Sequence, residues 1–144
     1  MIYFDTSYML KCYVSEQGSQ DVRKIWENTP ATACCEFGRM EFVAALHRVY
    51  REGRVTNDEL RVILRRWRRD QEQSLWNWMP LHAIIIDEVL RMFETLPREV
   101  YLRASDAIHL ACARENGFAE IYTNDRHLKI AAAHWGLTAC DVIV

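Results

Sequence analysis

The chain has 144 residues, of which half are hydrophobic and 26% are charged, and its formal net charge is −2. This balance is ordinary for a globular protein and excludes a disordered chain. The small net charge gives no overall attraction to nucleic acid or to a membrane surface, so affinity for a polyanion must come from a local patch or from metal ions. The length suits one domain, and we expect residues 1–144 to form a single one.

Cysteine usage and hydropathy place the protein in the cytoplasm. The five cysteines are scattered and include no C-x-x-C pair, so we expect them to be reduced and to act as small hydrophobic residues. The N-terminus leads directly into an apolar strand pattern without a signal peptide, and the aliphatic run at residues 83–86 is too short to cross a bilayer. We therefore expect a soluble cytoplasmic protein without a membrane segment.

Strand and helix patterns alternate along the chain. Short apolar runs predict strands at residues 2–4, 31–35, 120–123 and 138–144, with a further short strand or bend at 80–81. Helical spacing and caps predict helices at residues 8–14, 20–28, 36–52, 57–78, 86–96, 104–116 and 126–135. Such alternation predicts a three-layer α/β/α fold around a mostly parallel sheet of about five strands.

The predicted helix at residues 36–52 is apolar around most of its circumference, which is typical of a helix in the core. Glu41 lies on this helix. A carboxylate in such a place must be paired, protonated or bound to a metal ion. Arg39 and Arg48 are the nearby residues that would pair with it.

Three further acids are predicted to lie at one edge of the sheet. Asp5 and Asp125 each follow a predicted strand, and Asp106 opens the helix that leads into the second of these strands. Ligands of open α/β sheets bind outside the carboxyl ends of the strands. Each acid also has a structural alternative, because Asp is common as a helix cap, in the first helical turn and in turns.

Together with Glu41, these acids would form a cluster of four carboxylates. Such a cluster repels itself unless cations neutralise it, and oxygen ligands favour Mg²⁺ or Mn²⁺. A site of this kind suits attack of water on a phosphodiester. The hydroxyls of Thr6, Ser7 and Thr123 are candidates for holding water or phosphate there, although they are equally candidates for caps.

A basic stretch lies on the predicted helix at residues 57–78. Arg61, Arg65, Arg68 and Arg69 share one face of this helix and are candidates for contacts with the phosphates of a nucleic acid, the alternative being a solvated face paired with acids or a surface that binds a partner protein. The tryptophans at positions 67, 76 and 78 are candidates for base stacking, but packing in the core or in a dimer fits their spacing better. His109 has no partner at metal-ligand spacing and is interpreted as a hydrogen-bonded helix residue.

The motifs around these acids resemble those of the PIN-domain nucleases, and among them the VapC-type toxins of toxin-antitoxin pairs. The resemblance is carried by Asp5-Thr-Ser, by Glu41 on a mid-chain helix, by Arg103-Ala-Ser-Asp106-Ala-Ile-His-Leu-Ala and by Thr123-Asn-Asp125. It implies a parallel α/β fold whose acidic quartet, here Asp5, Glu41, Asp106 and Asp125, binds Mg²⁺ or Mn²⁺ and cleaves RNA. It also implies a homodimer that a small cognate antitoxin keeps inactive.

Two other functions are compatible with parts of the pattern. An aspartyl-phosphate phosphatase also places an acid such as Asp5 after its first strand, but it needs a second acid two residues later, where this chain has Ser7. A PIN-like module that binds RNA or protein without cleaving it is the non-enzymatic alternative. The presence of all four acids argues against it.

Overall fold

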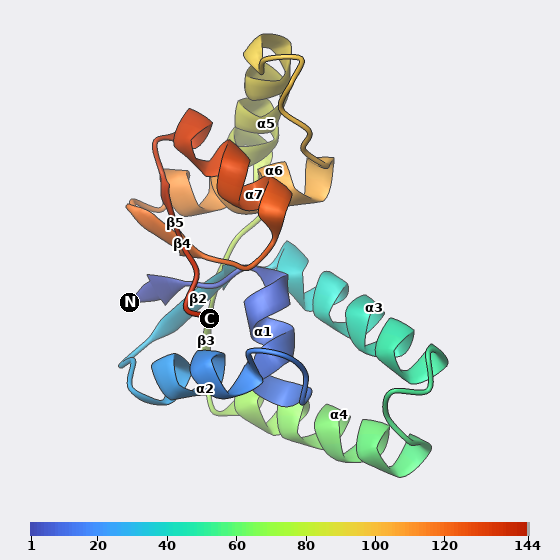
Figure 1. Cartoon of the computed structure of the whole chain (residues 1–144). Helices are drawn as coiled ribbons and strands as arrows, with labels where there is room; N and C mark the ends of the chain where they lie inside the picture. The colour runs from blue at the N-terminus through green and yellow to red at the C-terminus, as the bar shows by residue number, and fades with distance from the viewer. Residues whose placement is uncertain (144) are drawn as a thin grey trace.

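Parallel strands form the centre of the molecule. The computed structural model describes residues 1–143. In this part of the chain the strands are β1 (Ile2–Tyr3), β2 (Thr32–Cys35), β3 (Trp76–Met79), β4 (Glu120–Tyr122) and β5 (Thr138–Cys140). β1, β2 and β3 form one parallel sheet, and β4 and β5 form another. A parallel bridge between Phe4 and Tyr122 joins the sheets, so the strand order is β3-β2-β1-β4-β5 (Figure 1).

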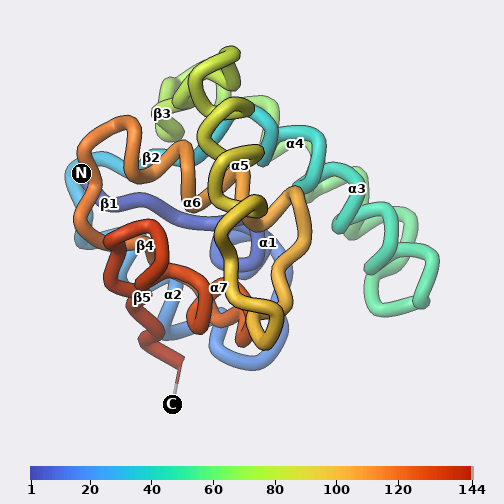
Figure 2. The backbone as a smooth tube through the Cα atoms, turned by 90° about the horizontal axis from the view of Figure 1, so that it is seen from above, coloured from blue at the N-terminus to red at the C-terminus, as the bar shows by residue number. Residues whose placement is uncertain are grey.

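Helices cover both faces of these strands. They are α1 (Thr6–Tyr13), α2 (Ser19–Glu27), α3 (Phe37–Arg51), α4 (Asn57–Glu72), α5 (Ala83–Thr95), α6 (Ala104–Glu115) and α7 (Arg126–Ala131), the last continued by a 3₁₀ turn, Ala132–Trp135. Figure 1 shows α1 to α4 on one side of the strands and α5 to α7 on the other. From above, α3 and α4 extend together beyond the sheet (Figure 2).

Side chains of the strands point alternately to the two faces of the sheet, and they pack into two separate hydrophobic cores. Tyr3 and Cys35 are fully buried in the core with α5, α6 and α7, whereas their neighbours Phe4 and Cys34 are fully buried in the core with α1 and α3. Successive side chains of a strand point to opposite faces, so each strand feeds both cores. The predicted three-layer α/β fold with a parallel sheet is therefore confirmed.

The segment after α4 differs from the prediction. The sequence predicts a helix reaching residue 78, but α4 ends at Glu72 and residues 76–79 form strand β3 beside β2. Ser74, with a φ of 55°, reverses the chain between them. The alternating Trp-Asn-Trp-Met sequence suits a strand, and Trp76 stacks on Trp26 with ring centroids 5.5 Å apart. Burial of these aromatic rings favours a strand here, although the apolar residues are spaced as in a helix.

Helix α3 is not the central core helix that its composition predicts. Phe42, Leu46 and Val49 are buried on one face, but Met40 is 63% and Val43 is 45% exposed on another. The cause is the position of α3 at the edge of the molecule, where only one face meets the sheet and its neighbours. An apolar surface is thus left open on this helix.

Two remaining expectations concern the C-terminus and the membrane. The last strand ends at Cys140, before the predicted end at residue 144, and Val144 itself lies outside the described residues. Within residues 1–143, no helix has the length and apolar character needed to cross a membrane.

Candidate active site

Asp5 and Asp125 lie at the carboxyl ends of the adjacent strands β1 and β4. The amide of Asp5 donates to the Tyr122 carbonyl at 3.1 Å, which fixes Asp5 beside β4. Both acids also cap helices: Asp5 accepts from the amide of Tyr8 at the start of α1, and Asp125 accepts from two amides at the start of α7. Both acids therefore act as helix caps, as the structural alternative proposed, and the capping hydrogen bonds hold each carboxylate in place at the edge of the sheet.

The Asp5 carboxylate is buried among neutral donors. The Thr123 hydroxyl donates to it at 2.5 Å and the Ser7 hydroxyl at 2.7 Å, and no salt bridge to Asp5 is found among residues 1–143. Burial raises the pKa of Asp5 above its ordinary value, and the hydrogen bonds offset this only in part. Its ionised form would be stabilised by a cation in the adjoining space.

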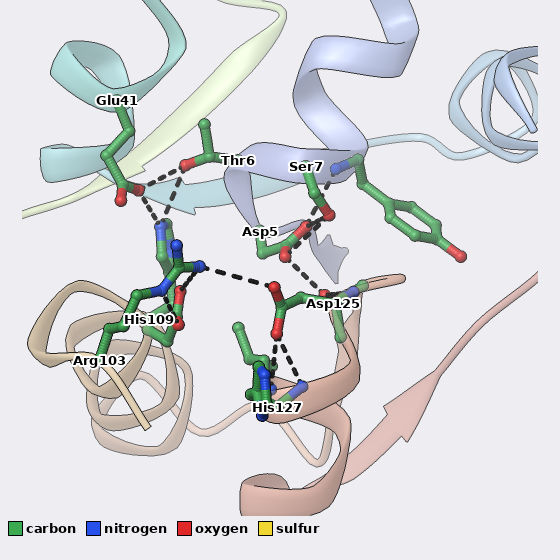
Figure 3. Close-up of polar contacts among 12 residues, drawn as sticks. Asp5, Thr6, Ser7, Glu41, Arg103, His109, Asp125 and His127 are labelled. Atoms are coloured by element: carbon green, nitrogen blue, oxygen red, sulfur yellow. Dashed lines mark hydrogen bonds and ion pairs between the residues drawn. The ribbon is translucent and has the colours of Figure 1, made fainter. Parts of the chain in front are cut away.

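Glu41 is held by two partners that the sequence does not predict. The Thr6 hydroxyl donates to Glu41 Oε2 at 2.7 Å, and His109 Nε2 lies 2.6 Å from the same oxygen (Figure 3). Burial acts to raise the pKa of Glu41, but His109 and Thr6 outweigh it and the pKa is lowered. The structural alternative, pairing with Arg39 or Arg48, is not found, because Glu41 faces α1 and α6 rather than along its own helix.

Asp106 and Asp125 share the guanidinium of Arg103. Arg103 Nε donates to Asp106 Oδ2 at 2.8 Å, and its Nη2 lies 3.2 Å from Asp106 Oδ1 and 3.5 Å from Asp125 Oδ2. Arg103 immediately precedes α6, so the Arg-Ala-Ser-Asp segment sets the cation three residues before the acid. The dipole of α6 adds to the stabilisation of Asp106 in its first turn.

The four acids line one cavity of about 520 Å³ at the carboxyl ends of β1 and β4. Figure 3 shows Asp5 near Asp125, with Glu41 on α3 on the other side of Asp5. Cationic side chains also reach this cavity. They are Lys11, Arg48 and Arg103.

The residues of the cavity fit a hard divalent cation by their chemistry. Four carboxylates offer the oxygen ligands that Mg²⁺ and Mn²⁺ prefer. Within residues 1–143, no three Asp, Glu, His or Cys side chains already converge as they would around a metal ion. Two of the acids contact Arg103 instead, and Glu41 contacts His109. The four carboxylates therefore fit a divalent cation by their chemical type, and not by a metal-binding geometry already formed among residues 1–143.

The other predicted site residues have different surroundings. The Thr6, Ser7 and Thr123 hydroxyls all donate to carboxylates of the cavity, and Thr123 is fully buried. None of the α4 arginines is among the residues of the described chain that line the cavity. Those expected to contact RNA are Arg61, Arg65, Arg68 and Arg69, and that contact stays a prediction.

Known proteins show similarity to this chain at the level of family and fold. The model of the PIN domain family matches residues 2–133. VapC20 of Mycobacterium tuberculosis, described as a toxin that cleaves the sarcin-ricin loop, superposes with a TM-score of 0.71 at 15% identity, covering 91% of this chain and 95% of that one. A toxin-antitoxin complex from Klebsiella pneumoniae gives a TM-score of 0.61 at 17% identity, covering 93% and 94%. No curated protein matches the chain. At such identities the two structures show a shared fold, while the family model spans most of the chain: it belongs to the PIN domain family.

Proposed function

We propose that the protein is a metal-dependent endoribonuclease and the toxin of a type II toxin-antitoxin pair. The observation that carries the proposal is the meeting of Asp5, Glu41, Asp106 and Asp125 around one cavity at the carboxyl ends of parallel strands. PIN domains are typically nucleases. The four clustered carboxylates would repel one another and the phosphates of RNA, so the proposed activity depends on a divalent cation.

In the proposed mechanism the four acids hold one or two Mg²⁺ or Mn²⁺ ions. When bound, the metal would polarise the scissile phosphate and lower the pKa of water. Asp5 is kept in place by Ser7 and Thr123, and Glu41 by Thr6 and His109. Arg48 and Arg103, which line the same cavity, are suited to bind the phosphates that flank the cleaved bond.

The partners follow from the same proposal. The similarity to a toxin-antitoxin complex supports a small antitoxin as a binding partner. Exposed apolar side chains on α3 and α5, such as Val43 and Leu90, support a homodimer. An RNA substrate would place the protein in the cytoplasm, where its free cysteines stay reduced.

Metal removal and loss of one ligand test the proposed activity together. Purified protein should cleave a mixed-sequence RNA with Mn²⁺ present, should stop in EDTA and should resume when Mn²⁺ is restored. Asp106→Asn should reduce the rate by more than about 100-fold, beyond the usual cost of losing a hydrogen bond to a metal ligand. Asp87→Asn, at an exposed acid on α5, is the matched control and should cleave like the wild type. Cleavage that persists in EDTA contradicts the proposal, and failure to bind Mn²⁺ or to cleave favours a non-catalytic binding module.

A further inference from the structure

His109 connects the core of the protein to Glu41. Its ring is 2% exposed, between the sheet and α3. The Tyr3 hydroxyl lies 3.0 Å from Nδ1, on the core side of the ring. On the other side, Nε2 lies 2.6 Å from Glu41 Oε2 and 3.1 Å from Thr6 Oγ1 (Figure 3). Tyr3 is itself fixed, because its hydroxyl accepts from the amide of Cys35 at 3.0 Å. A continuous hydrogen-bonded path thus runs from β2 to the carboxylate.

The partners of Nε2 determine which atom carries the hydrogen. Thr6 uses its single hydroxyl hydrogen to donate to Glu41 Oε2, and an ionised Glu41 accepts only. The hydrogen between His109 and these oxygens must therefore be on Nε2. Nδ1 either accepts from Tyr3 or donates to it, depending on the charge of the ring. In both states Nε2 donates to Glu41.

We propose that His109 and Thr6 are positioning residues that orient Glu41 for the divalent cation. They hold Oε2 and leave Oε1 without a hydrogen bond among residues 1–143, so that this oxygen is the one available to the cavity. This inference rests on the proposed function. It adds that metal affinity depends on His109 and Thr6, which hold a ligand without touching the metal ion.

The buried space around the ring must hold a side chain that can donate a hydrogen bond to Glu41. A leucine would fill the same buried space, yet it could not donate to Glu41. Gly38, one turn before Glu41, brings α3 so close that an added Cβ would lie 3.4 Å from His109 Cε1 and 3.3 Å from Thr6 Oγ1. This close approach lets the next turn of α3 place Glu41 within reach of both donors.

Mn²⁺ titration by calorimetry, with thermal unfolding measured in parallel, tests the proposal. His109→Leu should weaken Mn²⁺ binding by about 10- to 100-fold, the usual effect of losing a hydrogen bond to a metal ligand. His109→Gln places an amide N–H near the position of Nε2 and should remain within a few-fold of the wild type. Thr6→Val removes the second donor to the same oxygen and should weaken binding as well. His134→Leu, at an exposed histidine, is the control and should bind like the wild type.

The outcomes separate this inference from the proposed function. Wild-type protein that binds Mn²⁺, with His109→Leu binding equally well, overturns the positioning role and leaves the nuclease proposal standing. Equal losses in His109→Leu and His109→Gln also overturn it, because they would indicate a role in packing only. If His109→Leu does not fold, unchanged binding by Thr6→Val overturns it. Wild-type protein that binds no Mn²⁺ contradicts both proposals.

Discussion

Asp5 is a carboxylate whose surroundings disfavour its charge. Because its pKa in the folded state lies above the ordinary value of 3.8, the folded protein binds this proton more tightly than the unfolded chain does. The resulting stabilisation is fully present below about pH 3.8 and is lost as the pH rises through the raised pKa. Without a metal ion, ionised Asp5 therefore destabilises the fold at neutral pH.

Asp5→Asn should separate stability from metal binding. The amide stays neutral at every pH, so in EDTA at pH 7 we expect a higher unfolding temperature than in the wild type, with the difference closing as the pH falls toward 3.8. Added Mn²⁺ should stabilise the wild type by linkage and leave Asp5→Asn unchanged. Differential scanning calorimetry over a pH series, with Asp87→Asn as control, measures both effects. A wild type that remains the more stable protein at pH 7 in EDTA would contradict the conclusion that the buried, ionised carboxylate of Asp5 destabilises the fold.

Single residues differ in how far the sequence reveals them. The acids are detectable in the sequence because each follows a strand, opens a helix or interrupts an apolar pattern, as Asp5, Asp106 and Glu41 do. The ion-pair partner of Asp106 is also detectable, because Arg103 lies only three residues before it in the sequence. The partner of Glu41 is not detectable in this way, since His109 is 68 residues away and the contact exists only because α3 and α6 meet at the sheet. Sequence spacing therefore predicts which acids line the cavity better than it predicts the side chains that hold them.

Among the helices, α3 depends on a glycine for its position. Gly38 lies in its first turn with helical geometry, so replacement by Ala would ordinarily stabilise the helix by about 1 kcal/mol. Here an added Cβ would lie 2.6 Å from the sulfur of Cys34, a fully buried residue on β2. Overpacking of this kind costs about 1–3 kcal/mol. We expect Gly38→Ala to destabilise the protein and to weaken Mn²⁺ binding, because α3 also carries Glu41.

A double mutant tests the origin of this effect. Cys34→Ala removes the sulfur, so Gly38→Ala should be much less costly in the Cys34→Ala background than in the wild type. Urea unfolding of the four proteins gives the coupling free energy, which we expect to exceed about 1 kcal/mol for residues in direct contact. Additive effects of the two substitutions would show that the close approach of α3 to β2 is not the reason for glycine at this position.

Element boundaries show which sequence signals are decisive. Apolar runs and caps correctly predict β1, β2, β4 and the start of α4, where the Thr56–Glu59 capping box is present. The signal fails where tertiary contacts decide the outcome. Residues 76–79 continue a helical spacing but pair with β2, and α3 is apolar on a face that the rest of the described chain leaves exposed. The first failure reflects burial of tryptophan rings, and the second reflects the position of α3 at the edge of the molecule.

At the scale of the whole molecule, the cavity is assembled from segments that are far apart in sequence. Asp5, Glu41, Asp106 and Asp125 come from four elements, and both cores contribute to holding them. Metal binding at such a place should stabilise the entire fold, because a cation bound only by the native state lowers its free energy relative to the unfolded chain. The strand order that brings β1 beside β4 is therefore as necessary to the proposed site as the acids themselves.

The exposed apolar surface on α3 and α5 predicts how the whole molecule associates. Met40 and Val43 on α3 and Ile84 and Leu90 on α5 are each at least 45% exposed. Large exposed apolar patches on a protein surface mark sites of interaction with another protein. In a two-fold dimer that uses this surface, the copies of each residue in both subunits would be buried at the interface. Val43→Glu should therefore cost roughly 3 kcal/mol or more of dimer stability, an increase of at least about 100-fold in the dissociation constant.

Sedimentation equilibrium or light scattering over a concentration series measures this change. Leu75→Glu is a matched control, because Leu75 is 43% exposed, close to the 45% of Val43, but lies just before β3 at the opposite end of the strands from the acids. We expect the control to remain dimeric where Val43→Glu is monomeric. A monomeric wild type, or equal dissociation in both variants, contradicts a dimer through α3. A monomeric Val43→Glu that still binds Mn²⁺ would further show that each subunit carries a complete set of ligands, as expected when all four acids come from one chain.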